Sequence, residues 1–197
     1  MKGVAILLTI AGIIFIGIGG YQLFKTDHSQ NKSLEEAKIR LADQKSETSS
    51  SLQSSHMLEP FLPDEGESVG ILHIPRLNAE LPIIEGTDPE ELAKGVGHYA
   101  GTAYPLEKNQ VVLSGHRDTV FRRMGELKLG DTLTVRMPYG DFTYQITDTE
   151  IVNADDRTVI KSTAPDEVLT LTTCYPFSYI GNAPDRYIIT ALPVINE

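Results

Sequence analysis

The chain has 197 residues, of which 22% are charged and 41% hydrophobic, as is typical of a globular protein rather than a disordered or collagen-like one. Its formal net charge of −10 argues against a nucleic-acid partner, because no basic stripe offers a footprint for phosphates. The single cysteine, Cys174, excludes an intramolecular disulfide and a metal cluster built from cysteines. Composition alone leaves two roles open for this thiol: a small buried apolar side chain or a nucleophile.

The first element is an uncharged apolar segment from Val4 to Phe24. About 20 apolar residues in a helix cross the hydrocarbon core of a bilayer, so the segment predicts a transmembrane helix. The alternative is a cleaved signal peptide, whose apolar region is usually only about 7–15 residues long. We interpret residues 4–24 as a retained signal anchor of a single-pass cell-membrane protein. The flanking charges barely constrain orientation, and we expect the rest of the chain to be extracytoplasmic.

Residues 25–67 are predicted to form a flexible stalk. Within it, Ser33 and Glu36 make a capping box for a short helix from Ser33 to Ala42. The run from Ser46 to Ser55 is polar and low in complexity, which is typical of a flexible linker.

Residues 68–197 have the pattern of an all-β domain. Eight short strand-like runs recur, separated by Gly, Pro and Asp. One short helix is predicted over Thr87–Gly95, with Pro89 in its first turn and Gly95 at its end. Strands of this number and spacing predict an eight-stranded β-barrel, closed or nearly closed, because closure removes exposed sheet edges.

Three residues with suitable chemistry lie at the ends of predicted strands. His116 follows the apolar run Val111–Leu113, Cys174 follows Leu169–Leu171, and Arg186 opens the last strand-like run. A thiol must ionise to attack a carbonyl, and an imidazole can accept its proton and later return it. A guanidinium can donate hydrogen bonds to a developing oxyanion. Taken singly, each residue is equally compatible with a structural role.

Together these segments resemble the sortase family. Leu113-Ser114-Gly115-His116, Thr170-Leu171-Thr172-Thr173-Cys174 and Asp185-Arg186-Tyr187 match, in order, the family's histidine, T-L-x-T-C and arginine motifs. The resemblance covers about Ser68 to Glu197, and the Tyr-Pro-Phe after the cysteine is similar to class D members. It implies the eight-stranded sortase-type barrel that the strand pattern predicts independently.

The resemblance also implies a reaction. Cys174 would attack the threonine carbonyl of an LPxT-like sorting signal on a secreted surface protein, forming a thioester. His116 would act as acid and base, and Arg186 would stabilise the oxyanion. An amine of a cell-wall precursor would then resolve the thioester. Thr173 is a further candidate, because its backbone or hydroxyl could help bind the oxyanion.

We expect no cofactor and no metal. Asp118 lies close to His116, but aspartate commonly caps a turn, and we leave it outside the catalytic set. His73 and His98 lie in strand-like runs and are interpreted as structural. Some sortases bind calcium, but the available acids lack EF-hand spacing and fit a solvated surface better. These acids are Asp148, Glu150, Asp155 and Asp156.

Two other functions remain open from the sequence. A hydrolytic cysteine peptidase would use the same Cys–His pair, since hydrolysis and transfer differ in water exclusion and acceptor binding. A membrane-tethered binding module would hold Cys174 buried and inert.

Overall fold

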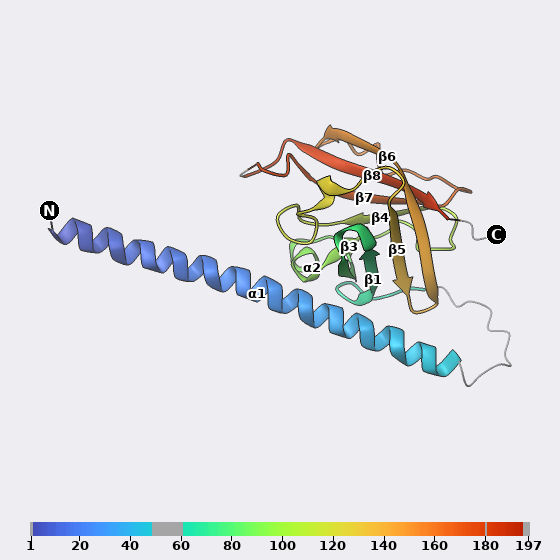
Figure 1. The fold of residues 1–197 in the computed structure, drawn as a ribbon, viewed down its shortest axis with the longest axis horizontal. Helices are drawn as coiled ribbons and strands as arrows, with labels where there is room; N and C mark the ends of the chain where they lie inside the picture. The colour runs from blue at the N-terminus through green and yellow to red at the C-terminus, as the bar shows by residue number, and fades with distance from the viewer. Residues whose placement is uncertain (1, 49–60, 180, 195–197) are drawn as a thin grey trace.

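The computed structural model describes residues 2–48, 61–179 and 181–194. A long helix lies beside a β-barrel, and its N-terminal part projects beyond the barrel (Figure 1). The elements are α1 (Lys2–Thr48), β1 (Ser68–Ile74), η1 (Pro75–Leu77), β2 (Ala79–Glu85), α2 (Pro89–Lys94), β3 (Val96–His98), β4 (Gln110–Ser114), η2 (Met124–Glu126), β5 (Thr132–Met137), β6 (Gly140–Asn153), β7 (Val168–Tyr175) and β8 (Asp185–Pro193).

The eight strands form a closed barrel in the order β1-β2-β3-β4-β7-β8-β6-β5. The predicted eight-stranded all-β fold is therefore confirmed, as is the short helix near residues 87–95, which the structure has as α2. Two neighbouring pairs, β2 with β3 and β4 with β7, are parallel. The second pair matters for the site, because parallel neighbours end at the same edge of a sheet.

The barrel is filled by side chains that alternate along the strands. On β5, Leu133, Val135 and Met137 are buried, while the residues between them are only partly covered. This period of two is what a strand with one face on a core requires. Tyr144 is fully buried as well, and its hydroxyl donates a 2.7 Å hydrogen bond to Glu167 Oε1. This buried hydroxyl therefore has a hydrogen-bond partner.

His98 is structural, as the sequence predicts. Its ring is buried, with Nδ1 2.6 Å from Glu85 Oε2 and Nε2 3.0 Å from the carbonyl oxygen of Ala103. Tyr104 stacks on the imidazole at 4.0 Å and donates its hydroxyl to the same Glu85 carboxylate. Burial alone would raise the pKa of Glu85, but the hydrogen bonds from His98 and Tyr104 hold it below its ordinary value. Both ring nitrogens of His98 are therefore occupied.

Helix α1 differs from the flexible stalk that the sequence predicts. It continues without a break from Lys2 to Thr48, so residues 25–48 of that stalk are helical. The physical reason is packing on the barrel: Ser33 and Ala37 are buried, and the Ser33 carbonyl accepts a 3.1 Å hydrogen bond from Ser68 Oγ. Lys38 also lies 3.6 Å from Glu80 of β2. Most of the predicted linker run Ser46–Ser55 lies outside the described residues.

The first part of α1 keeps the character of a membrane span. Among the described residues, α1 provides one helix that is long and apolar enough to cross a bilayer, by length and composition. Large apolar side chains are exposed around it, namely Val4, Leu7, Ile10, Ile13, Ile14, Phe15, Ile16 and Ile18.

Contacts with the barrel begin before Ser68, the predicted start of the domain. Phe61 packs edge-on against Tyr104 at 4.9 Å and against Tyr139 at 5.4 Å between ring centroids. Gly66 N–H donates to the carbonyl oxygen of Glu85 at 2.8 Å. The segment 61–67 is thus part of the folded body.

A chain that begins at Ser68 should consequently be less stable than one that begins at Phe61. Fully burying a phenylalanine side chain contributes about 1.5–3 kcal/mol, and the shorter chain loses the part of this that the partly buried Phe61 provides. Thermal unfolding of both chains measures the difference, and Phe61→Ala in the longer chain measures the ring's share. Equal melting temperatures for all three would place the boundary at Ser68 after all.

Candidate active site

His116 follows the end of β4, and Cys174 lies near the end of β7, the parallel neighbour of β4. In the ladder between β4 and β7, Ser114 is opposite Thr172. One residue further on, the Gly115 N–H donates to the Thr172 carbonyl oxygen at 3.1 Å. The two candidates therefore follow matched positions on neighbouring strands, which brings them to one edge of the barrel despite their separation in sequence.

Arg186 lies directly across from Cys174. Strands β7 and β8 are antiparallel, and their register pairs Cys174 with Arg186 and Thr173 with Tyr187. Opposite residues in an antiparallel pair project to the same face, with Cβ atoms about 4.5–5.5 Å apart. The structure thus brings all three sequence-predicted residues, His116, Cys174 and Arg186, to one place.

The site is open to solvent but not fully exposed. Cys174, His116 and Arg186 are each partly buried. Arg186 Nη1 donates to two backbone carbonyl oxygens of its own segment, of Asp185 at 3.0 Å and of Ala183 at 3.4 Å. Such bonds hold the guanidinium at the mouth of β8. The partial exposure of Cys174 leaves its thiol accessible to a substrate.

Comparison with known proteins identifies the family of this chain. Residues 72–194 match the sortase domain family. Sortase D of Bacillus subtilis (strain 168) is 49% identical over 190 residues, which cover 95% of this chain and 96% of that protein. The chain belongs to the sortase family. Sortases are cysteine transpeptidases, so this chain is a cysteine transpeptidase. Cys174 is the single cysteine in its sequence.

Solved sortase structures share the fold. A Clostridium perfringens sortase D5 transpeptidase superposes with a TM-score of 0.67 at 24% identity, over 85% of this chain and 99% of that one. Sortase C of Clostridium perfringens SM101 gives 0.62 at 26% identity, over 86% and 92%. The closed barrel described above is therefore the sortase barrel.

Thr173 has a structural use in this sortase. Its side chain is buried, and its hydroxyl donates a 2.7 Å hydrogen bond to the carbonyl oxygen of Gly115. The hydroxyl proton thus binds Gly115, the residue that precedes His116. The sequence had left open a hydrogen bond from this hydroxyl to the oxyanion instead. The bond to Gly115 joins the residue before Cys174 to the residue before His116, and so connects β7 to the segment that carries the histidine.

Gly115 is required by close packing at the turn into His116. A Cβ atom there would lie 2.5 Å from Cδ2 of Phe121, whose ring is fully buried. Phe121 in turn donates its N–H to the His116 carbonyl oxygen at 3.0 Å. The ring therefore closes the turn that presents the histidine.

Gly115→Ala is expected to reduce both stability and activity. Overpacking a core typically costs about 1–3 kcal/mol, and a displacement of about 1 Å at a catalytic group can cost up to about 10² in rate. Thermal unfolding and peptide-transfer rates measure the two effects. The double variant Gly115→Ala/Phe121→Leu should recover part of the loss, because leucine vacates the space. No recovery would mean that the ring does not determine the turn.

Two features near the site were not found from the sequence. Arg117 Nη1 donates to the Pro176 carbonyl oxygen at 3.1 Å, and its Nη2 to that of Gly181 at 2.8 Å. Tyr175, Phe177 and Tyr187 also form an aromatic cluster beside Cys174, with centroid distances of 5.3–6.1 Å. All four residues lie next to or near the predicted site residues in the sequence, which was the available signal. Contacts between separate loops, however, cannot be inferred from the spacing of residues along the chain.

Asp118 is exposed, and its backbone carbonyl accepts hydrogen bonds from Arg122 Nε at 3.0 Å and Nη2 at 2.6 Å. Its placement within a turn agrees with leaving it out of the catalytic set. Of the acids considered for calcium, Asp148 and Glu150 are exposed on β6. Asp156 accepts hydrogen bonds from the N–H and hydroxyl of Thr158, which lower its pKa.

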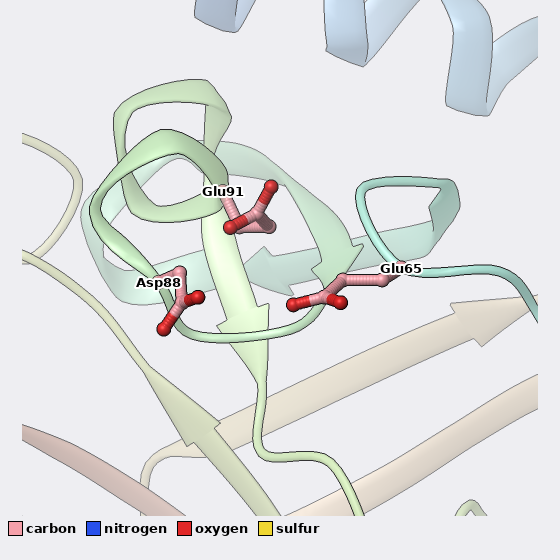
Figure 2. Close-up of side chains that lie close together, drawn as sticks. All are labelled: Glu65, Asp88 and Glu91. Carbon is pink, nitrogen blue, oxygen red and sulfur yellow. The ribbon is translucent and has the colours of Figure 1, made fainter.

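A different acidic cluster lies near α2 (Figure 2). Glu65, Asp88 and Glu91 each place a carboxylate oxygen within 4.8 Å of the others. Glu65 and Asp88 are exposed, and the buried Glu91 is 3.7 Å from Lys94 Nζ. Exposed acidic groups are common without a metal, and a lysine already offsets the buried carboxylate. We assign no metal to this cluster.

Proposed function

We propose that this sortase cleaves an LPxT-like sorting signal of a secreted surface protein and joins its threonine to an amine of a cell-wall precursor. The observation that carries the proposal is the register of the barrel. It pairs Cys174 with Arg186 and sets the segment of His116 beside the strand of Cys174. The family supplies the transpeptidase chemistry, and these three residues match its motifs.

In the first half-reaction, the Cys174 thiolate attacks the threonine carbonyl carbon. The tetrahedral intermediate carries an oxyanion, which the Arg186 guanidinium stabilises by donating hydrogen bonds. The bond from carbon to the leaving nitrogen then breaks, and His116 protonates that amine. A thioester on Cys174 and a free peptide amine remain.

In the second half-reaction, the acceptor amine attacks the thioester carbon while His116 removes its proton. The carbon–sulfur bond breaks, the new amide is released, and Cys174 returns to the thiolate. Arg186 uses only Nη1 for the carbonyl oxygens of Asp185 and Ala183, and a guanidinium has further N–H donors for the oxyanion. Thr173 contributes by holding Gly115, and hence His116, in place.

The N-terminal part of α1 would anchor the enzyme in the cell membrane, with the barrel on the extracytoplasmic side. The exposed apolar side chains from Val4 to Ile18 support a bilayer environment, because they have no barrel to pack against. An anchored enzyme meets a lipid-linked acceptor at raised effective concentration.

The test is mass spectrometry of the product formed from an LPxT-type peptide and a small primary amine such as glycinamide. We expect the mass of the new amide at the threonine, in an amount that rises with amine concentration. A free carboxylic acid at every amine concentration would instead make the protein a hydrolytic peptidase. An uncleaved peptide would contradict the sorting-signal substrate.

A further inference from the structure

Arg117 joins the segment that follows His116 to the loop between Cys174 and Arg186. Its Nη1 and Nη2 donate to the carbonyl oxygens of Pro176 and Gly181, at 3.1 and 2.8 Å. The guanidinium carbon also lies 5.8 Å from the centre of the Tyr179 ring, a cation–π distance. All three partners belong to the loop between β7 and β8, whereas Arg117 follows His116 directly.

Besides Arg117, the β7–β8 loop is held at its far end by the Ala154 N–H, which donates to the Pro184 carbonyl oxygen at 2.8 Å, and by Phe177, which packs on Tyr187. The strand ladder ends at the pair Tyr175–Asp185, so the loop beyond it has no partner strand. Within the loop, the Tyr179 N–H donates to the Pro176 carbonyl oxygen at 3.2 Å, a bond that closes only one turn. Arg117 accordingly provides a link from this loop to the rest of the site.

The chemistry of the link requires arginine. A guanidinium is planar and presents its donors in a rigid fork, so two of its nitrogens can bind two separate carbonyl oxygens at once. A lysine ammonium is a compact, strongly hydrated charge on a flexible stem and does not reproduce that spread. The two carbonyl oxygens here belong to Pro176 and Gly181, which are well separated along the loop.

We propose that Arg117 is a positioning residue, which clamps the β7–β8 loop to the His116 segment and so preforms the wall of the peptide site between Cys174 and Arg186. This role rests on the proposed function. Without the clamp the loop must be ordered each time a peptide binds. This ordering cost reduces the binding free energy of the substrate and of the transition state by the same amount, so KM should rise while kcat changes little.

The test compares Arg117→Gln and Arg117→Lys with wild type in the full chain, kept in detergent micelles. Steady-state kinetics on an LPxT-type peptide should give a kcat/KM about tenfold lower for both variants, mainly through KM. Hydrogen exchange at the Tyr179 amide should become faster in both, because its acceptor, Pro176, is no longer held. Arg122→Gln is the matched control, since the Arg122 side chain donates to the Asp118 carbonyl oxygen within its own turn.

Three results would overturn the clamp. If Arg117→Lys matches wild type in KM and exchange, the charge alone acts. If Arg117→Gln is unchanged, the contacts do not constrain the loop. If Arg122→Gln gives the same KM rise, the effect is general to the segment. Should Arg117→Gln fail to fold, Arg117→Lys still decides between clamp and charge. A wild-type enzyme inactive on the peptide would contradict the proposed function, and exchange at Tyr179 would still test the clamp.

Discussion

Replacing Cys174 with alanine is expected to abolish peptide transfer while leaving the barrel folded. Removal of a covalent nucleophile costs on the order of 10⁶ in kcat, because no other group in the site can form the thioester. Cys174 is the sole cysteine, and it lies partly exposed near the end of β7, so a smaller side chain should leave the core intact. Mass spectrometry of the amide product measures activity, and circular dichroism checks the fold.

The thiol itself provides the control for this variant. A mild alkylating reagent can label only Cys174, so wild-type labelling reports on that one site. Rapid labelling, slowed when His116 is replaced by alanine, is expected if the imidazole favours the thiolate. An unreactive thiol would favour an inert, buried cysteine, and near-normal product from a folded Cys174→Ala protein would refute the thioester mechanism.

Replacing Arg186 with lysine should lower kcat by about 10²–10³, or roughly 3–4 kcal/mol of transition-state stabilisation. Lysine keeps the positive charge but replaces a planar fork of donors with one hydrated ammonium. An interaction made mainly in the transition state affects kcat more than KM, in contrast to the pattern expected for Arg117. Steady-state kinetics on an LPxT-type peptide separate the two parameters.

The matched control for this second variant is Arg136→Lys. Arg136 lies on β5, which borders neither β4, β7 nor β8, and it forms a 2.7 Å ion pair with Glu80 that a lysine can also make. It should therefore keep normal kinetics. If Arg186→Lys is as active as wild type, the guanidinium geometry is irrelevant and only charge matters. If Arg186→Ala is also fully active, Arg186 has no part in the chemistry.

The sequence by itself determined the elements and the chemical identities. Short strand-like runs separated by Gly, Pro and Asp predicted the strands. The apolar segment 4–24 predicted a helix of membrane-spanning length. The three motifs around His116, Cys174 and Arg186 carried the resemblance to the sortase family, to which the chain belongs, and the chemical role of each residue stays a prediction.

Only the tertiary structure decided how these parts meet. No local pattern predicts that β4 is the parallel neighbour of β7, or that the β7–β8 register places Arg186 opposite Cys174. Strand pairing depends on contacts between segments that are distant in the sequence. The same applies to Arg117, whose hydrogen-bond partners lie in a loop distant in sequence. Helix α1 continues through the predicted stalk because Ser33 and Ala37 pack on the barrel, a stabilisation that local composition does not contain.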